Sequence, residues 1–381
     1  MAKFQLDKSF SQPERVLLVG VMLAADFSGA NEIRERSFQA ALAEAAELVL
    51  AAGGELVQTE TAKRERAHSA LFVGTGKADE LAAIVRQQEI ELVVFNHELT
   101  PTQERNLEKV LQCRVLDRVG LILAIFAQRA QSQEGKLQVE LAQLTHLASR
   151  LVRGYGHLQS QKGGIGLKGP GETQLETDRR LINVKITALK RQLQAVEKQR
   201  ATRRKARQNS ALKTFALVGY TNTGKSSLFN RLTKADVLAK DQLFATLDTT
   251  ARRLYLSAEC SVILTDTVGF VRDLPHGLVA AFSATLEETA LADVLLHVVD
   301  ASHPEYERQM DDVNQVLQEI GAGEVPQLVL YNKIDLLPKH ERPTGILRDG
   351  QGKAVAVNLS VLSGAGLDDL RVVMQEWADA V

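Results

Sequence analysis

The sequence predicts an α/β protein in three parts: a mainly parallel N-terminal α/β domain, an antiparallel helical hairpin and a doubly wound C-terminal α/β domain. Two observations indicate this class. Short apolar runs alternate with helical patterns over residues 1–122 and again over residues 211–381, as in parallel sheets covered by helices. Residues 123–210 instead carry apolar side chains at helical spacing on both sides of a glycine-rich segment at about 154–171.

In the N-terminal domain, apolar runs predict the strands and amphipathic patterns predict the helices. Pro101 favours a helix start after Thr100, because proline fits the first position of a helix. The expected elements are, in order, strand Val16–Val21, helix Phe38–Ala52, strand Glu55–Thr59, helix Lys77–Gln88, strand Leu92–Phe95, a helix from Thr100 and strand Cys113–Leu116.

Two apolar stripes predict the helical hairpin. The second stripe steps by four and three residues, as in a short heptad seam. Between the stripes, seven glycines and one proline over residues 154–171 disfavour a regular helix. The first stripe comprises Val139, Leu141, Leu144, Leu147 and Leu151, and the second comprises Ile182, Ile186, Leu189, Leu193 and Val196.

The C-terminal domain is predicted from five short apolar runs with helical patterns between them, which indicate a second parallel sheet. These runs are Thr214–Val218, Ser261–Thr265, Val294–Val299, Gln327–Leu330 and Ala354–Leu359.

Charge is nearly balanced overall, with a net charge of −1, but it is unevenly distributed. Residues 185–207 hold nine basic residues against one acidic residue, Glu197, and Arg150, Arg153, Lys162 and Lys168 add to them. A basic arm on a near-neutral protein predicts binding to a polyanion such as rRNA. Because Tyr155 and His157 are the aromatic side chains of this region, phosphate contact should dominate over base stacking.

Cysteine use and hydropathy point to a cytoplasmic protein. Cys113 and Cys260 are expected to be reduced thiols with no disulfide or metal-binding spacing. The N-terminus lacks the apolar core of a signal peptide. The longest apolar runs, Val16–Ala25 and Leu121–Ala127, are too short to span a bilayer, so no membrane partner is expected.

Within the C-terminal domain, a phosphate loop follows the first strand. Its glycines let backbone N–H groups converge on phosphate oxygens at a helix N-terminus, and Lys225 reaches the β- and γ-phosphates. The predicted phosphate-binding residues are Gly219, Tyr220, Thr221, Asn222, Thr223, Gly224, Lys225, Ser226 and Ser227.

Two further segments predict a Mg²⁺ site beside the phosphates. The Ser226 hydroxyl is expected to bind Mg²⁺ directly, and Asp266, at a strand end, to hold it through water. Thr246 can bind the ion only when the γ-phosphate is present, although Thr249 and Thr250 compete for this role. Lys225, Thr246 and Gly269, whose N–H senses the γ-phosphate, are the expected catalytic residues. The two segments comprise Phe244, Ala245, Thr246, Leu247 and Asp248, and Asp266, Thr267, Val268 and Gly269.

A fourth motif, Asn332, Lys333, Ile334 and Asp335, predicts guanine as the base. A carboxylate at Asp335 can accept two N–H donors from the edge of guanine, a pair that adenine does not offer. The stem of Lys333 can cover the base. A backbone N–H in Ser360, Val361 and Leu362 is expected to meet the guanine carbonyl. The four motifs in this order predict a GTPase that takes GTP as substrate and gives GDP.

Phe270 follows Gly269, at the position where Ras-type enzymes carry the glutamine that orients the attacking water. A phenyl ring can neither donate nor accept a hydrogen bond. We therefore expect slow hydrolysis by the protein alone and strong stimulation by a macromolecular partner.

Together these residues resemble the HflX family, ribosome-associated GTPases of the translation-factor-related class. The resemblance lies in Asp117–Arg129, Glu134–Ala142, Gly163–Arg179 and Phe244–Asp248. It implies binding to the large ribosomal subunit, with the hairpin and its glycine-rich loop reaching toward the peptidyl-transferase region. It also implies GTP-dependent splitting of stalled ribosomes under stress. We expect a monomer.

The sequence departs from the family pattern in three places. Thr249 stands where many members have proline, and Val361 where alanine is usual. The sequence stops at Val381, whereas many members continue into a small C-terminal domain, so contacts of that domain are in doubt.

Two alternative functions stay open at this stage. Gly74, Thr75, Gly76 and Lys77 look like a shortened phosphate loop, which would suit ATP-dependent RNA or ribosome remodelling through the N-terminal domain, with the GTPase regulatory. This segment equally suits a tight strand-to-helix turn. Alternatively, the protein could be a GTP-gated binding module that sequesters subunits and uses hydrolysis only for release.

Overall fold

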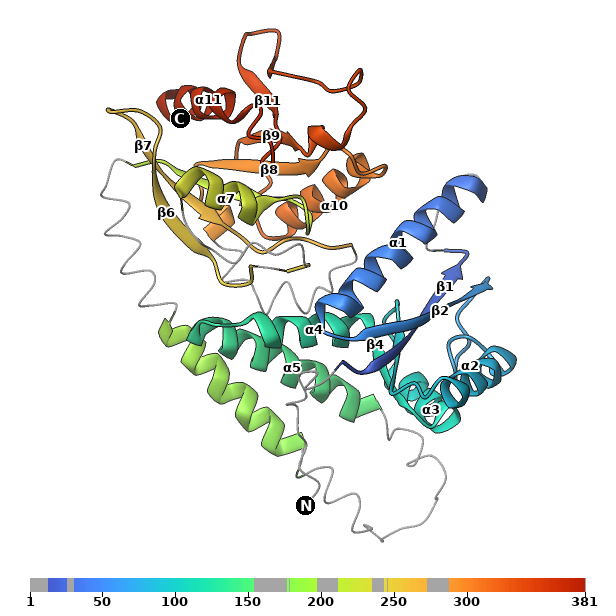
Figure 1. The fold of residues 1–381 in the computed structure, drawn as a ribbon. Helices are drawn as coiled ribbons and strands as arrows, with labels where there is room; N and C mark the ends of the chain where they lie inside the picture. Colours follow the sequence, from blue (N-terminus) through green and yellow to red (C-terminus); the bar gives the residue numbers. More distant parts are fainter. Residues whose placement is uncertain are drawn as a thin grey trace. The chain divides into compact units, whose positions relative to one another are not determined.

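The structure, a computed structural model, describes residues 13–25, 31–153, 177, 179–196, 212–234, 243–244, 246–272 and 288–380. The chain divides into two compact units, one of residues 1–128 and 136–193 and one of residues 129–135 and 194–381. Figure 1 shows the elements of both units. The predicted α/β class is confirmed, whereas the division into three parts stays a prediction.

The first unit is built on a parallel sheet of order β2-β1-β3-β4. Most predicted elements are present, with ends that differ by a few residues. Helix α1 begins seven residues before the predicted start, and β2 runs five residues past the predicted end. The elements are β1 Arg15–Leu23, α1 Asn31–Ala51, β2 Glu55–Arg64, α2 Thr75–Gln87, β3 Leu92–Phe95, α3 Pro101–Leu111, β4 Arg114–Asp117, α4 Arg118–Arg129 and α5 Gln133–Arg153.

Helices cover both faces of this sheet. On one face, Leu17 and Val19 of β1 pack in a cluster with Leu81 of α2 and Leu107 of α3. On the other face, Gly20 lies against α1, where an added Cβ would be 2.7 Å from the Leu42 side chain. The absence of a side chain at Gly20 therefore lets α1 approach the sheet closely.

The two predicted apolar stripes lie on neighbouring helices, α5 and helical residues 179–196, which run in opposite directions side by side in Figure 1. Leu189 and Leu193 are buried, whereas the polar positions around them are exposed. Lys185 and Glu140 form an ion pair of 2.7 Å between the helices. We call these two helices the helical pair. The glycine-rich loop and the basic residues from Lys198 to Arg207 lie outside the described residues.

Arg150 was expected to join the basic surface, but it is used inside the first unit. Its guanidinium lies 2.6 Å from the Asp117 carboxylate and also pairs with Glu104. Asp117 is fully buried, so the charge of Arg150 compensates a carboxylate rather than meeting a polyanion.

The second unit has a sheet of order β10-β11-β9-β8-β5-β7-β6 whose central five strands are parallel. This is the predicted doubly wound sheet, extended by the antiparallel strands β6 and β10. The elements are β5 Thr214–Val218, α7 Lys225–Thr233, β6 Thr250–Tyr255, β7 Ser261–Asp266, β8 Val294–Asp300, α10 Tyr306–Glu319, β9 Gln327–Asn332, the 3₁₀ turn η1 Ile334–Leu336, β10 Ile346–Arg348, β11 Ala354–Asn358 and α11 Leu367–Ala380.

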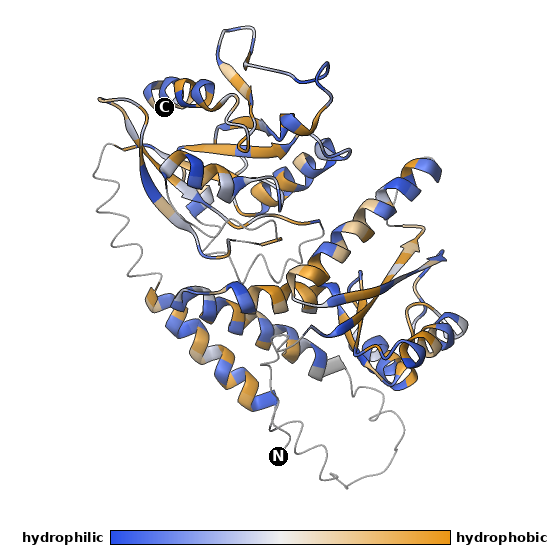
Figure 2. Ribbon diagram, in the orientation of Figure 1, coloured by the Kyte–Doolittle hydropathy of each residue, from blue (hydrophilic) through white to orange (hydrophobic). Residues whose placement is uncertain are grey.

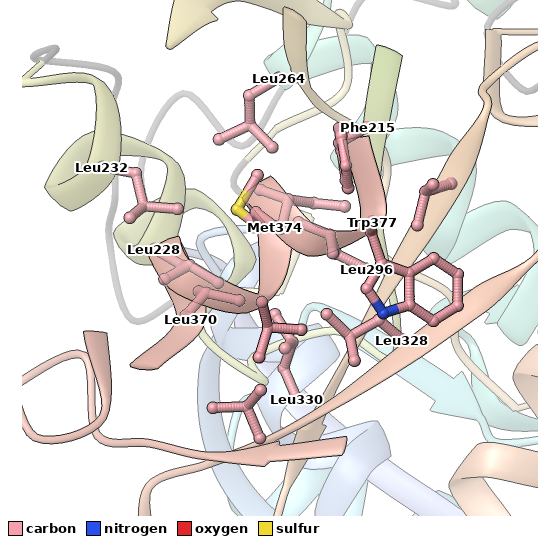
Figure 3. Close-up of a cluster of buried hydrophobic side chains, with 14 of the residues drawn as sticks. Phe215, Leu228, Leu232, Leu264, Leu296, Leu328, Leu330, Leu370, Met374 and Trp377 are labelled. Atoms are coloured by element: carbon pink, nitrogen blue, oxygen red, sulfur yellow. The ribbon is translucent and has the colours of Figure 1, made fainter. Parts of the chain in front are cut away.

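The core of the second unit lies between this sheet and helices α7 and α11 (Figure 3). Strand β8 is apolar over most of its length, as Figure 2 shows, because it lies in the middle of the sheet. Trp377 of α11 packs in this core. Its indole N–H donates to the Ala354 carbonyl at 3.1 Å. The core thus fixes the carboxyl ends of β5, β7, β8 and β9 at one edge.

Candidate functional site

A cavity of about 730 Å³ lies at this edge of the sheet, a size typical of small-ligand sites. Its walls come from the phosphate loop, the switch segment Phe244–Asp248, the end of β7 and the turns after β9 and β11. The lining residues are Thr221, Asn222, Gly224, Lys225, Ser226, Ser227, Arg231, Phe244, Thr246, Thr267, Gly269, Asn332, Lys333, Asp335, Leu336, Val361 and Leu362. Four motifs that are far apart in the sequence therefore meet in one cavity.

The phosphate loop follows β5 and ends where α7 begins, at Lys225. Gly219 has φ of 144°, and an added Cβ would collide with the carbonyl oxygen of Val298 on β8. Gly224 precedes the helix with φ of 95°. Both glycines are thus required by the turn, which presents the N-terminus of α7 to the cavity.

Lys225 lies under the phosphate loop, where its ammonium donates to the carbonyls of Gly219 at 3.0 Å and Tyr220 at 2.5 Å. Burial lowers the pKa of Lys225 to about 8, although the charge of Asp266 opposes this shift. A desolvated cation in this position attracts the phosphates of a nucleotide strongly.

Three oxygen-bearing side chains converge beside Lys225. The Thr246 hydroxyl donates to Asp266 Oδ2 at 2.9 Å and lies 2.8 Å from Ser226 Oγ. Burial raises the pKa of Asp266, against hydrogen bonds from Ser226 and Thr246 and the charge of Lys225. The structure therefore brings together Ser226, Thr246 and Asp266, the three residues that were predicted to hold Mg²⁺. Of the competitors of Thr246, Thr250 lies opposite Asp266 on strand β6.

The donor set fits a magnesium ion. Asp266 Oδ1 is buried and meets no hydrogen-bond donor among the described residues, as expected of an oxygen that faces a hydrated cation. One carboxylate with hydroxyl groups, completed by phosphate oxygens and water, is the environment that Mg²⁺ prefers.

The segment after β7 lies against the phosphate loop. An added Cβ at Gly269 would be 3.0 Å from Lys225 Nζ, so only glycine brings this backbone so close. The Phe270 N–H donates to the Gly219 carbonyl at 3.1 Å, and its carbonyl accepts from Thr221 N at 2.7 Å. The Phe270 ring is buried, so it can neither reach nor orient a water molecule in the cavity.

The predicted base-binding end is organised by Asn332. Its amide donates to the Thr223 carbonyl at 2.8 Å and its Oδ1 accepts from Val361 N at 3.0 Å, so it joins two loops. Asp335 and Leu362 line the cavity beside it. Ser360 is fully buried and accepts from Ser363 N at 3.1 Å, which makes it a loop-shaping residue rather than a lining one.

The remaining predicted residues take supporting positions. Leu247, Val268 and Ile334 are buried beside the cavity, and Thr267 donates to the Leu217 carbonyl at 2.5 Å. Asp248 is not part of the cavity lining and contacts Ser132. Ala245 lies outside the described residues.

Comparisons with known proteins bear on this site. Family models described as "GTP-binding GTPase N-terminal", "GTP-binding GTPase Middle Region" and "50S ribosome-binding GTPase" match residues 39–127, 129–207 and 214–333. The GTPase HflX of Escherichia coli strain K12 is 54% identical over 329 residues, which cover 86% of this chain and 77% of the relative. The chain belongs to the HflX family of GTPases. It is therefore a GTP-hydrolysing enzyme.

Other relatives agree with this assignment. The GTPase HflX of Caldanaerobacter subterraneus is 47% identical over 358 residues, 94% of this chain and 79% of that protein. A solved structure entitled "crystal structure of SsGBP and GDP complex" has a TM-score of 0.50 at 23% identity and covers 96% of this chain and 99% of its own. This likeness supports the fold.

Three residues of this HflX-family site were not predicted from the sequence. Arg231 lines the cavity because it lies one helical turn after Ser227 on α7. Leu336 lines it from the turn after β9. Asp300 ends β8 beside Asn332 and pairs with Lys333 at 2.8 Å. An aspartate at the carboxyl end of a central strand was the available signal for the last of these.

Proposed function

We propose that this chain binds GTP in the described cavity and couples its hydrolysis to the large ribosomal subunit, splitting stalled ribosomes. The observation that supports nucleotide binding best is that Lys225, Thr246 and Asn332 line one cavity and that the buried Asp266 bonds Thr246 there. The expected location is the cytoplasm. Among the described residues, no helix has the length and apolarity needed to cross a membrane.

Each side chain takes a role that follows from its position. Lys225 binds the β- and γ-phosphates, Asp335 binds guanine, and Ser226, Thr246 and Asp266 hold Mg²⁺. When bound, Mg²⁺ neutralises the charge that develops on the phosphate oxygens. Because Phe270 cannot orient water, the ribosomal partner supplies or positions the missing group.

The subunit-binding surface is proposed on the helical pair. A shallow hollow along residues 179–191 is lined by Arg179, Arg180 and Arg191, together with Asn183 and Thr187. Three guanidinium groups on one exposed helix suit the phosphates of rRNA. The family name "50S ribosome-binding GTPase" supports the same partner.

The ATP alternative gains no support from the N-terminal turn. Lys77 lies 2.7 Å from Glu60 and 3.2 Å from Glu80, so two carboxylates already surround the ammonium that would meet a phosphate. Three residues of the Gly74–Lys77 segment lie in the first turn of helix α2, which begins at Thr75 after Gly74 as its N-cap.

To test this function, 70S ribosomes are mixed with the full chain and their dissociation into subunits is measured by sedimentation. GTP and a non-hydrolysable GTP analogue should both release free subunits, and GDP should release none. Sustained turnover should require GTP. Release by ATP that survives Lys225→Ala would instead favour the remodelling alternative.

A further inference from the structure

Asp248 lies at the start of helix α5, although it belongs to the switch segment. Its Oδ2 accepts hydrogen bonds from the backbone N–H groups of Gln131 and Ser132, each at 2.8 Å. The Ser132 hydroxyl donates to Asp248 Oδ1. All of these residues belong to the second compact unit.

This contact extends an N-terminal cap. Helix α5 begins at Gln133, and the Ser132 hydroxyl accepts from Gly135 N at 2.8 Å, as the side chain of an N-cap residue does. The carboxylate of Asp248 adds a negative charge where the helix dipole is positive and where N–H groups lack partners within the helix.

Gly135 supplies independent evidence that this approach is built into the chain. An added Cβ at Gly135 would collide with Asp248 Oδ1 and lie 3.1 Å from Ser132 Oγ. Glycine inside a helix costs about 1 kcal/mol relative to alanine. A glycine in the first turn of α5 is thus unfavourable for the helix but necessary for the carboxylate.

The other end of the same segment lies at the predicted metal site. Thr246, two residues before Asp248, contacts Asp266 and Ser226. Leu247 between them is 3% exposed and therefore anchored in the core. Two residues span roughly 7 Å at most, so a large displacement of Thr246 from the predicted metal site must also move Asp248.

We propose that Asp248 is a latch through which the nucleotide at Thr246 controls the start of helix α5. Triphosphate and Mg²⁺ hold Thr246 in place, and this keeps Asp248 on the N-H groups of Gln131 and Ser132. Helix α5 passes from the second compact unit into the first at Lys136, so the latch acts on a helix of the helical pair. Because coupling is reciprocal, a partner that displaces α5 also changes nucleotide affinity.

The inference rests on the nucleotide-binding part of the proposed function and needs no ribosome. Hydrogen exchange of residues 131–135 is measured in the full chain saturated with GDP or with a non-hydrolysable GTP analogue. Calorimetry on the same samples verifies saturation, so a failure to bind nucleotide is distinguished from a failure of the latch.

With the GTP analogue, these amides should exchange about tenfold more slowly than with GDP, within the usual range of coupling between sites. Gly135→Ala should abolish this difference, although alanine favours the helix. Gly76→Ala is the matched control, because Gly76 lies in helix α2 with open space around its Cβ position, and it should behave as wild type.

A second pair of variants tests the contact itself. Ser132→Ala and Asp248→Ala should each reduce the nucleotide dependence, and the double variant should add little to either single change. Equal exchange of residues 131–135 with both nucleotides in the saturated wild type would overturn the inference. A wild-type difference that persists in Gly135→Ala and Asp248→Ala would overturn it equally.

Discussion

Asn332 shows how one side chain organises the nucleotide cavity. By bonding the Thr223 carbonyl and the Val361 N–H, it fixes the phosphate loop and the loop after β11 at a set separation. Lys333 is held in turn by Asp300. The predicted base-binding end is therefore held together by polar contacts within the protein, and Asp335 lines the cavity beside them.

Asp335→Asn should change which base is bound. Guanine offers two N–H donors to a carboxylate, and an amide can accept only one of them, so affinity for GDP should fall by roughly a hundredfold while xanthosine diphosphate gains. Titration calorimetry with both nucleotides measures this exchange. Asp368→Asn, at an exposed position on α11, should leave both affinities unchanged; an equal loss for both bases in Asp335→Asn would contradict the assigned role.

His297 on β8 should make stability depend on pH. Burial lowers the pKa of His297 to about 4, although a hydrogen bond with Gln327 opposes the shift. The unfolded chain, with a histidine pKa near 6.5, binds the proton more readily. The contribution of the neutral His297 to the free energy of unfolding is therefore fully present above pH 6.5. It is lost, by roughly 3 kcal/mol, as the pH drops toward 4.

Chemical denaturation between pH 4 and 7 tests this expectation. His297→Gln should flatten the pH dependence of the free energy of unfolding, whereas His340→Gln, at a side chain that is 80% exposed, should keep the wild-type slope. An unchanged slope in His297→Gln would show that other groups dominate.

Among single residues, the carboxylate, amide and lysine beside strand ends could be chosen from the sequence, and Lys225, Asn332 and Asp335 do line one cavity. Arg231 and Asp300 were missed because they act through three-dimensional proximity to Ser227 and Lys333. For Ser360 the expectation concerned a backbone N–H of its segment and stays a prediction, while its buried side chain accepts from Ser363 N and shapes the loop.

At the level of elements, apolar runs located the buried parallel strands, such as Leu92–Phe95 and Thr214–Val218, because both of their faces are covered. Strand β6 was missed since its polar sequence, with three exposed residues in succession, belongs to a sheet edge. Helix α1 was predicted too short because its first turns are exposed and polar. Strands at the edge of a sheet and the ends of helices therefore show the weakest apolar pattern in the sequence.

Arg150→Met should destabilise the first unit by about 3 kcal/mol, because it removes the guanidinium that pairs with the buried carboxylate of Asp117. Urea denaturation measures the loss. Lys185→Met, which removes an ion pair whose partners are 57% and 41% exposed, should change the free energy by less than about 1 kcal/mol. Similar effects of the two variants would contradict the burial argument.

For the whole molecule, the nearly balanced net charge results from two units with different surfaces. The nucleotide cavity is confined to the second compact unit, and the arginine-lined hollow to the first. Helix α5 runs from the second unit into the first, and Asp248 bonds the two residues before this helix. The group that Phe270 cannot supply is expected to come from a partner.

Binding to large ribosomal subunits should weaken steeply with salt, since phosphate contacts release counterions. Replacing Arg179, Arg180 and Arg191 with alanine should lower the slope of log affinity against log salt by roughly 2 to 3. Lys339→Ala, at an exposed position of the second unit, should not change the slope. A flat salt response of the wild type would contradict phosphate-led binding.

Partner-dependent GTP hydrolysis is the central claim, and steady-state turnover with and without purified large ribosomal subunits tests it most directly. The protein alone should be slow, subunits should raise the rate by at least about tenfold, as completion of a catalytic site by a partner does, and Lys225→Ala should be inactive in both conditions. Equal turnover with and without subunits would contradict the account.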